Sequence, residues 1–135
     1  MNDLIQLMIK TARDSLPHAY APYSNYSVAA CIQSEDGTLF TGVNVENCSY
    51  GLTLCAERSA ICQMVAKGQR IIQSIVLMAG DNALCAPCGA CRQCIHEFST
   101  PKTRILLCNQ ETLLQAITPD ELLPMAFSLK GHTHD

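Results

Sequence analysis

The sequence predicts an α/β fold, a three-layer α-β-α sandwich built on a mixed sheet of about five strands. Two stretches rich in apolar and β-branched residues flank the turn at residues 35–37, which indicates a β-hairpin. Beyond it, apolar strand-like stretches alternate with helical ones, which favours parallel strands, right-handed crossovers and helices on both faces. The 135 residues, 48% of them hydrophobic, suit one domain over residues 1–135 and exclude a mainly disordered chain.

Each element follows from a local pattern. Apolar residues at helical spacing that stop before Pro17 predict the first helix, and Gly68 ends the second. Apolar and β-branched runs predict strands. In chain order, we predict a helix at residues 3–16, strands at 26–33 and 38–43, a helix at 55–67, a strand at 71–79, a helix at 88–98, a strand at 104–109, a short helix at 111–117 and a last strand or loop at 122–127.

Composition argues against several classes of function. Nine Lys and Arg against twelve Asp and Glu give a net charge of −3 without a basic run, which disfavours nucleic-acid binding. The longest apolar runs, at 28–32 and 75–79, have five residues and are too short to span a membrane. The N-terminus has neither the basic start nor the apolar stretch of a secretory signal. We therefore expect a cytoplasmic protein with no nucleic-acid or membrane partner.

The chain has nine cysteines, which is unusual beside its full apolar complement. Secreted disulfide scaffolds are shorter and have an even number of cysteines. The odd number therefore favours a reducing compartment, with some thiols buried and others binding a metal. Four cysteines fall in predicted strands or on apolar helix faces and are expected in the core: Cys31, Cys62, Cys94 and Cys108.

Three further cysteines lie at predicted helix starts. Cys88 and Cys91 are three residues apart and share one face of a first helical turn, which Pro87 is suited to open. A helix N-terminus favours thiolate over thiol. With Cys55 from the other helix start, zinc would have three protein ligands and a fourth position open for water, as in a catalytic site. We expect one Zn²⁺ per chain.

Charged residues flank these cysteines. Three thiolates leave a zinc site with net negative charge, which weakens its ability to acidify water. Arg58 and Arg92 are predicted to offset this by donating hydrogen bonds to the sulfurs. Glu57 is predicted to take the proton of the water. Because residues two apart on a regular helix diverge, Cys55 and Glu57 share a pocket only if Cys55 sits at the irregular helix start.

Other interpretations of the cysteines are open from the sequence alone. The four cysteines from Cys85 to Cys94 recur every three residues, as in an iron–sulfur run, although Pro87 counts against one continuous helix through them. A structural zinc or iron–sulfur module acting as a binding protein would need a closed four-cysteine site and no carboxylate such as Glu57. RNA editing is disfavoured by the net charge of −3 and only three Phe residues.

The triplet Cys55-Ala56-Glu57, followed by Pro-Cys-x-x-Cys at 87–91, is the signature of zinc nucleoside and nucleobase deaminases. The fuller pattern resembles the small cytidine deaminases. Five stretches match their motifs in order and cover most of the chain: PYSNYSV at 22–28, FTGVNVEN at 40–47, TLCAER at 53–58, PCGACRQ at 87–93 and ELLPMAF at 121–127.

The resemblance implies a reaction, the hydrolysis of cytidine and deoxycytidine to uridine and deoxyuridine plus ammonia, in pyrimidine salvage. The closest rival is a deaminase acting on another base or on a nucleoside-like antibiotic. An amide paired with a carboxylate suits the hydroxyls of an ordinary ribonucleoside. By the resemblance, the zinc ligands are Cys55, Cys88 and Cys91, the proton shuttle is Glu57, and the ribose ligands are Asn44 and Glu46.

The resemblance also bears on assembly and specificity. The family is typically a homotetramer with active sites at subunit interfaces, and Tyr50 and Phe127 match positions that approach a neighbour's site. Three residues depart from the family pattern. Tyr26 replaces the usual Phe that packs on the pyrimidine, Ala29 replaces a Gly, and Cys48 replaces an Ala beside the substrate. We expect these departures to affect substrate preference and rate, not the reaction class.

Overall fold

One mixed sheet of five strands, in the order β2-β1-β3-β4-β5, organises the chain, of which the computed structural model describes residues 2–129. β1 (Val28–Ser34) pairs antiparallel with β2 (Leu39–Val43) and with β3 (Ile72–Ala79). β4 (Ser99–Cys108) runs parallel to β3, and β5 (Leu113–Ile117) runs antiparallel to β4. The predicted mixed sheet is confirmed.

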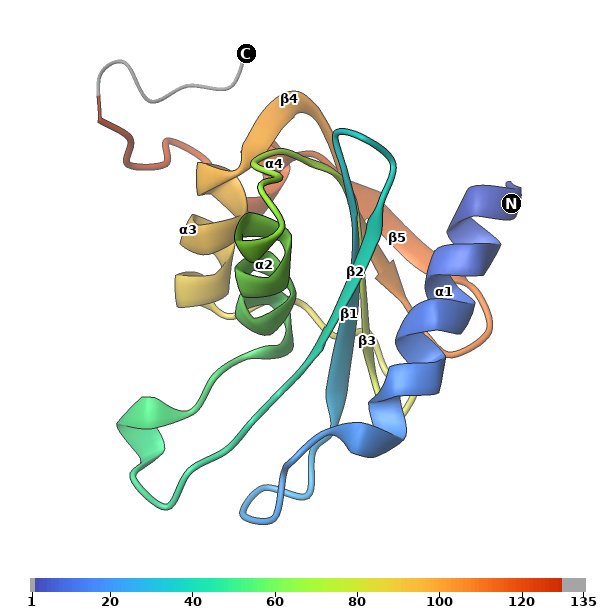
Figure 1. Cartoon of the computed structure of the whole chain (residues 1–135), viewed down its shortest axis with the longest axis vertical. Coiled ribbons are helices and arrows are strands. Elements are labelled where there is room, and N and C mark those ends of the chain that lie inside the picture. Colours follow the sequence, from blue (N-terminus) through green and yellow to red (C-terminus); the bar gives the residue numbers. More distant parts are fainter. Residues whose placement is uncertain (1, 130–135) are drawn as a thin grey trace.

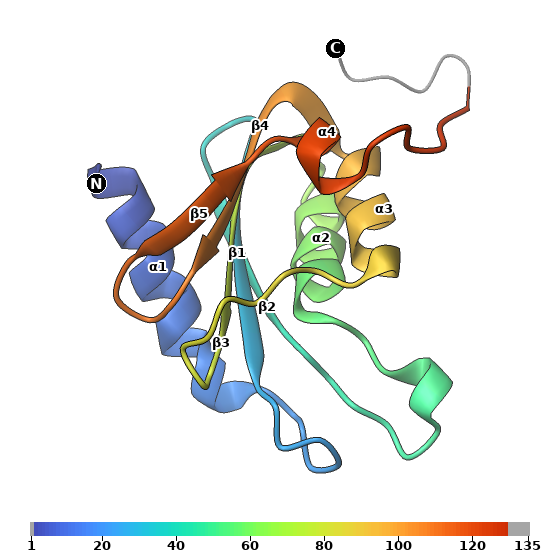
Figure 2. The ribbon, with the colours of Figure 1, turned by 180° about the vertical axis from the view of Figure 1, so that it is seen from behind.

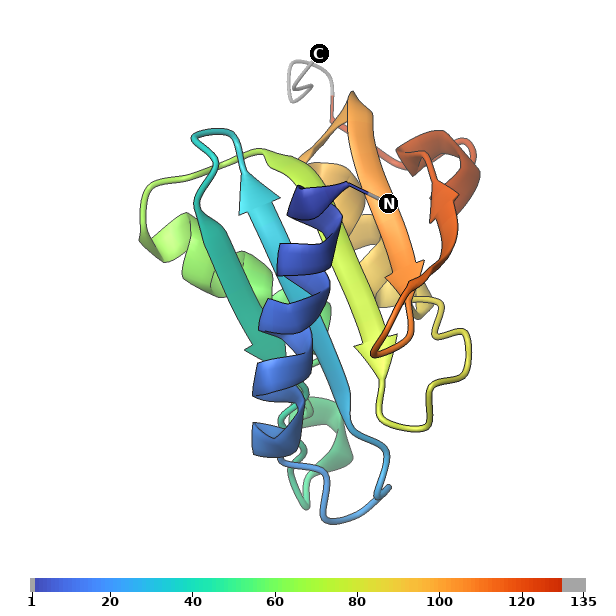
Figure 3. The same cartoon turned by 90° about the vertical axis from the view of Figure 1, so that its right-hand side faces the viewer.

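Helices cover both faces of the sheet. α1 (Asp3–Ser15) lies on one face, and α2 (Ala56–Ala66) and α3 (Gly89–Glu97) lie side by side on the other (Figures 1 and 2). Figure 3 shows α1 crossing in front of the strands. The strands alternate between two cores: Ala30 and Ile32 of β1 face the α2 side, whereas Ala29 and Cys31 face α1. The three-layer prediction is therefore confirmed.

The helices begin and end close to the predicted positions. The Asn2 side chain caps α1 by accepting a hydrogen bond of 2.8 Å from the backbone N–H of Ile5, and a short 3₁₀ turn, η1 (Leu16–His18), follows the helix. α2 and α3 each begin after a cysteine N-cap, Cys55 and Cys88, with extended backbone. Pro87 lies directly before the N-cap of α3, at the opening of the helix, as expected. Its fixed φ suits the extended approach to a helix.

The predicted short helix at residues 111–117 is wrong. The Asn109 side chain accepts hydrogen bonds of 2.8 Å from the backbone N–H groups of Glu111 and Thr112, which turns the chain back on itself. The following residues add to the free edge of β4 as β5. The segment after it, expected as a last strand or loop, begins with the short helix α4 (Pro119–Leu122) and continues as a loop.

A close contact fixes α2 on the sheet. A Cβ atom built on Gly42 of β2 would lie 2.4 Å from the backbone nitrogen of Ala60 and 2.5 Å from the carbonyl oxygen of Ala56. Only glycine permits this approach between strand and helix. Because Ala56 is the first residue of α2, Gly42 also determines where Cys55 and Glu57 lie relative to the sheet.

Outside this region, most cysteines lie as predicted. Cys31 and Cys108 are buried, and Cys94 packs against the core. Cys62 is exposed on α2, so its assignment to the core is wrong; it falls on the helix face that points away from the sheet. The sequence also predicts a solvated C-terminal tail with His132 and His134, and both lie outside the described residues. Within residues 2–129, no helix has both the length and the apolarity needed to cross a membrane.

Candidate metal and substrate site

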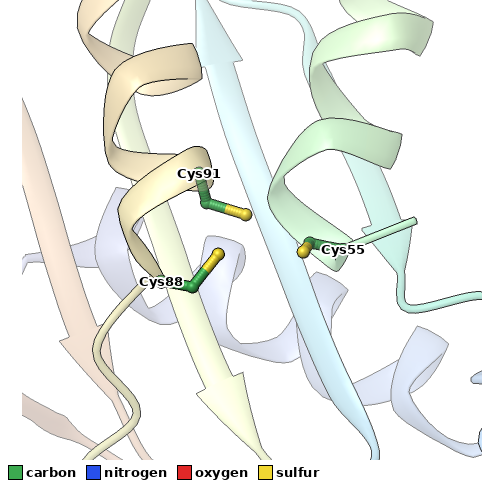
Figure 4. A group of neighbouring side chains, drawn as sticks. All are labelled: Cys55, Cys88 and Cys91. Carbon is green, nitrogen blue, oxygen red and sulfur yellow. The ribbon is translucent and has the colours of Figure 1, made fainter. Parts of the chain in front are cut away.

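Three cysteine sulfurs meet where α2 and α3 begin. Cys55 and Cys88 are the N-cap residues, and Cys91 lies in the first turn of α3. The three sulfur atoms lie within 4.8 Å of one another, and those of Cys88 and Cys91 turn toward Cys55 (Figure 4). Cys85 and Cys94 are not part of this group, so residues 2–129 do not bring the four regularly spaced cysteines together.

The two N-cap cysteines have extended backbone, with ψ of 155° at Cys55 and 170° at Cys88. N-caps are usually Ser, Thr, Asp or Asn, whose side chains bond back to the helix. Neither cysteine makes such a side-chain bond, which leaves both sulfurs directed into the space between the helices. The extended backbone of Cys55 also satisfies the condition set by the sequence, because Cys55 and Glu57 line the same cavity.

The donor set fits zinc. A tetrahedral zinc–thiolate site has bonds of about 2.3 Å and sulfurs roughly 4 Å apart, a spacing compatible with this group. Burial raises the pKa of the Cys55 and Cys91 thiols, whereas the backbone N–H groups of Cys91 and Ala90 lower that of Cys88. A bound thiophilic cation would offset the cost of ionising the buried thiols. A tetrahedral ion held by these three side chains would have one position left for a water.

Glu57 lies next to the sulfurs in the first turn of α2. Its side chain is only 4% exposed, and burial raises the pKa of its carboxyl. It lines a cavity of about 220 Å³ together with the three cysteines, in walls supplied by the starts of α2 and α3 and by the segments before β1 and after β2. Buried carboxyls with a raised pKa are typical of general acids and bases.

Tyr26 and Cys85 form part of the wall of this cavity. Burial, and then the nearby Cys85 thiol, raise the pKa of Tyr26 to about 12, so the hydroxyl stays protonated and serves as a donor. Val28 at the start of β1 pairs with Ala79 at the end of β3, which places the Tyr26 loop beside the carboxyl end of β3. Ligands in α/β folds bind at such an edge.

A second cavity, of about 360 Å³, adjoins the first through Thr53, which lines both. Its wall includes Glu46, Ser24 and Tyr50. Tyr50 begins a short 3₁₀ turn, η2 (Tyr50–Leu52), and its ring meets that of Tyr23 edge to face, with centroids 6.1 Å apart. The two cavities together offer one space for a ring beside the sulfurs and another for a polar group beside Glu46.

The two predicted ribose ligands line different cavities, Asn44 the inner one and Glu46 the outer one, and both already bond to the chain. The Asn44 amide donates a hydrogen bond of 2.8 Å to the carbonyl oxygen of Tyr26 and accepts one of 3.0 Å from the backbone N–H of Val28. One amide N–H and one lone pair stay free. Glu46 accepts hydrogen bonds from the backbone N–H groups of Tyr23 and Ser24 and from the Ser24 hydroxyl. These hydrogen bonds lower the pKa of the Glu46 carboxyl, and the one from the Ser24 hydroxyl has the largest effect.

Two other predicted substrate contacts do not face either cavity within this chain. Cys48 is exposed, and its thiol points to the side-chain oxygen of Asn47 at 3.7 Å. The side chain of Phe127 is 70% exposed, and its carbonyl oxygen accepts a hydrogen bond of 3.0 Å from the Gln93 amide. Phe127 is therefore not a core aromatic. Its role, like that of Cys48, stays a prediction.

The Arg92 guanidinium bonds to two backbone carbonyl groups, and its predicted contact with a sulfur stays a prediction. Its Nε donates a hydrogen bond of 2.8 Å to the carbonyl oxygen of Pro87, and its Nη1 donates one of 2.8 Å to that of Leu122. Arg92 thus holds the backbone that precedes Cys88 against α4, and these two hydrogen bonds do not go to a sulfur. The predicted contact of Arg58 with a sulfur stays a prediction.

Sequence reasoning missed several residues of the site. Ser24 bonds Glu46, Thr53 joins the two cavities, and Cys85 lines the inner one. Ser24 and Thr53 fall inside stretches matched to family motifs, but nothing in the pattern distinguishes them from other small polar residues. Cys85 lies outside the cysteines predicted to bind the metal, and its place in the wall depends on the path of the loop before α3.

Comparisons with known proteins agree with this geometry. The family described as "Cytidine and deoxycytidylate deaminase zinc-binding region" matches residues 2–107. A cytidine deaminase of Halalkalibacterium halodurans is 42% identical over 123 residues, which cover 91% of this chain and 93% of that protein. Among solved structures, the cytidine deaminase from Burkholderia pseudomallei superposes with a TM-score of 0.85 at 39% identity, covering 94% of this chain and 100% of that one. The cytidine deaminase from Mycobacterium tuberculosis superposes with a TM-score of 0.82 at 33% identity, covering 96% of this chain and 100% of that one.

Proposed function

Because the chain belongs to the cytidine deaminase family, we propose that it catalyses the zinc-dependent hydrolytic deamination of cytidine and deoxycytidine to uridine and deoxyuridine, with release of ammonia. The observation that carries the proposal is a buried carboxylate, Glu57, sharing one cavity with three converging cysteine sulfurs. Hydrolysis of an amino group from an aromatic ring needs an activated water and a proton carrier, and this arrangement supplies a place for both.

Cys55, Cys88 and Cys91 would hold the zinc ion, one per chain, and the bound ion would lower the pKa of a water, so that its deprotonation yields the hydroxide that attacks C4 of the pyrimidine. Glu57 accepts a proton from the attacking water and delivers it to N3 of the ring. It then carries the proton of the hydroxyl formed at C4 to the departing amino group, which leaves as ammonia while C4 becomes a carbonyl. Burial supports this role, because a carboxyl whose pKa is raised exchanges protons readily near neutral pH.

The substrate is placed by the remaining lining residues. We assign the pyrimidine ring to the inner cavity, against Tyr26, and the ribose to the space where the two cavities adjoin. Asn44 in the wall of the inner cavity and Glu46 in that of the outer one keep unused hydrogen-bonding capacity there. Tyr50 closes the outer cavity from the side. Cys48 lies one residue beyond Asn47, which lines this cavity, and is assigned to its rim.

Recognition of the sugar is tested by comparing cytidine with free cytosine. Cytosine leaves Asn44 and Glu46 without ribose partners, and an unpaired buried polar group costs about 1–3 kcal/mol, so kcat/KM should be about 5- to 150-fold lower than for cytidine. Conversion is followed by the loss of cytidine or cytosine absorbance. Asn44→Ala should lower kcat/KM for cytidine more than for cytosine, so that the two values come closer together. Equal activity of the unsubstituted chain on both would show that the ribose is not read.

We further propose a homotetramer whose sites are completed by neighbouring subunits. Several large apolar side chains are exposed in the single chain: Tyr50 at 75%, Leu52 at 70%, Met125 at 102% and Phe127 at 70%. Groups of this kind usually mark contact surfaces. A neighbour's Phe127 over the cavity would exclude water and strengthen the electrostatic interactions within.

Shared sites predict complementation between two inactive chains. Glu57→Gln and Phe127→Ala chains, each of low activity alone, should regain activity when unfolded and refolded together, because hybrid assemblies contain sites with both residues intact. Subunit exchange is checked by recovering hybrids of differently tagged chains, and the mass in solution is measured in parallel. Lack of recovery in demonstrated hybrids, or a fully active monomer, would defeat the shared-site proposal.

The setting we propose is nucleoside salvage in the cytoplasm, performed by one catalytic domain over residues 1–135. All nine cysteines are free thiols, as expected in a reducing compartment. The net charge of −3 suits a small nucleoside substrate better than a nucleic-acid backbone.

A further inference from the structure

We propose that Ser24 is a positioning residue that links recognition of the ribose to placement of the pyrimidine ring. The inference rests on the proposed function and adds to it a residue outside both the metal group and the predicted sugar ligands. Its basis is a chain of hydrogen bonds that runs from Glu46 through the Ser24 hydroxyl to the backbone of Tyr26.

The Ser24 hydroxyl occupies the centre of this chain. It donates a hydrogen bond to Oε2 of Glu46, and its oxygen accepts one of 3.0 Å from the backbone N–H of Tyr26. A hydrogen bond to an ionised carboxylate is about twice as strong as one between neutral groups. Ser24 therefore holds the carboxylate and the peptide group of Tyr26 in a fixed relation.

The other side of Tyr26 is held by the second predicted sugar ligand. The Asn44 amide donates to the carbonyl oxygen of Tyr26 and accepts from the N–H of Val28. The carbonyl oxygen of Tyr26 is thus bonded directly to Asn44, and its N–H is linked through the Ser24 hydroxyl to Glu46. Both of these residues are assigned to the ribose. The Tyr26 ring lines the cavity that contains Glu57.

The loop around Ser24 depends strongly on these bonds. It is anchored at its base by Tyr20, which pairs with Asn44 and Glu46 through backbone bonds of 3.0 and 2.8 Å. Further along, Asn25 has a φ of 56°, in the left-handed region. At the exposed tip, Glu46 supplies the side-chain acceptor for the backbone N–H groups of Tyr23 and Ser24.

The arrangement gives Glu46 two tasks. Oε1 accepts both backbone bonds, whereas Oε2 is the partner of the Ser24 hydroxyl and has the remaining capacity for a ribose hydroxyl. A sugar hydroxyl that bonds Oε2 therefore bonds the same atom that orients Ser24, and through it Tyr26. The sugar consequently contributes to placing the ring that reacts, and not only to affinity.

The test is the effect of Ser24→Ala on cytidine turnover, measured in the unsubstituted chain and again in a Glu46→Gln background. In the unsubstituted chain, loss of a hydrogen bond to a charged group should lower kcat/KM by about 10- to 100-fold, and part of this loss should appear in kcat. In the Glu46→Gln background the same substitution should cost at least several-fold less, because the partner carboxylate is gone. Single-turnover measurements with enzyme in excess extend the comparison to slow variants.

Matched variants separate positioning from a general effect on the loop. Ser24→Thr keeps the hydroxyl at an exposed position and should restore most of the lost activity. Ser27→Ala removes a hydroxyl three residues along the same segment that makes no hydrogen bond among the described residues, and should leave kcat/KM unchanged. All variants should melt within a few degrees of the parent, since the loop is exposed.

Two results would overturn the inference. One is Ser24→Ala with unchanged kinetics on cytidine. The other is an equal loss in both backgrounds, which indicates a structural role independent of Glu46. Failure of the proposed function itself is recognised separately, because the zinc-loaded parent chain would then fail to deaminate cytidine at all.

Discussion

Glu57→Gln is expected to keep its metal and its affinity for nucleoside while its turnover of cytidine falls by about 10²- to 10⁴-fold, the usual contribution of a general acid–base group. The amide has nearly the same size, so the packing at the start of α2 is preserved. It cannot accept the proton of the attacking water. Because Glu57 is assigned two transfers, to N3 and to the leaving amine, the effect should fall at the upper end of this range.

The measurement is kcat and KM from the absorbance change, with metal content and uridine binding determined on the same preparation. Glu97→Gln is the matched control, since it makes the same chemical change on the exposed side of α3. The Glu57→Gln chain should differ from the parent in kcat far more than in KM, whereas the Glu97→Gln chain should match the parent in both. A zinc-loaded Glu57→Gln chain with near-normal turnover would rule out the proton-carrying role.

Removal of any of the three cysteines that converge on the site should abolish stable zinc binding. Cys55→Ala, Cys88→Ala and Cys91→Ala each leave two protein ligands where zinc sites generally use at least three. The expected metal content after gel filtration is close to one zinc per chain for the parent and close to zero for these variants. Activity should fall at least as far as in Glu57→Gln, because the variants lose the activated water altogether.

The other cysteines provide the controls. Cys62→Ala changes an exposed thiol on α2, and Cys94→Ala changes a half-buried one on α3 a turn beyond Cys91. Both should keep zinc, and Cys94→Ala should lose only a small amount of stability. Should Cys85→Ala or Cys94→Ala release the metal while Cys55→Ala retains it, the ligand assignment would be wrong.

The electrostatics of the site make the two effects interdependent. Burial is the main cause of the raised pKa values of Cys91 and Cys55, and the negative charge of Glu57 raises both further. Thiolates and a carboxylate this close repel one another unless a cation lies between them. Zinc and Glu57 are therefore best examined as one unit, with metal content reported for every variant.

Much of the chemistry could be predicted from local sequence. The spacing of Cys88 and Cys91 places both at one helix start, because the geometry of a first turn depends on only a few residues. The same locality explains why the helices at α1, α2 and α3 and the hairpin of β1 and β2 were predicted within a few residues of their bounds. The five matched stretches then indicated the family and the reaction.

Other features required the tertiary structure. The residues of β5 have no strong local preference, and the free edge of β4 decides their conformation. The position of Cys55 beside Cys88 depends on the contact between Gly42 and α2, which no local pattern reveals. The Cys62 thiol faces outward because packing, and not helix propensity, selects the buried face of α2.

The sequence by itself determined the family and the class of reaction, and it predicted the ligand types and the general base, because these depend on which functional groups are present and how neighbouring ones are spaced. The tertiary structure alone decided how Ser24, Glu46 and Asn44 enclose Tyr26, and it showed that Phe127 is exposed in the single chain. The physical reason is that hydrogen bonds between segments some twenty residues apart depend on how strands and loops pack. Such distances are set by the whole fold, and a contact made by a neighbouring subunit is set by the assembly.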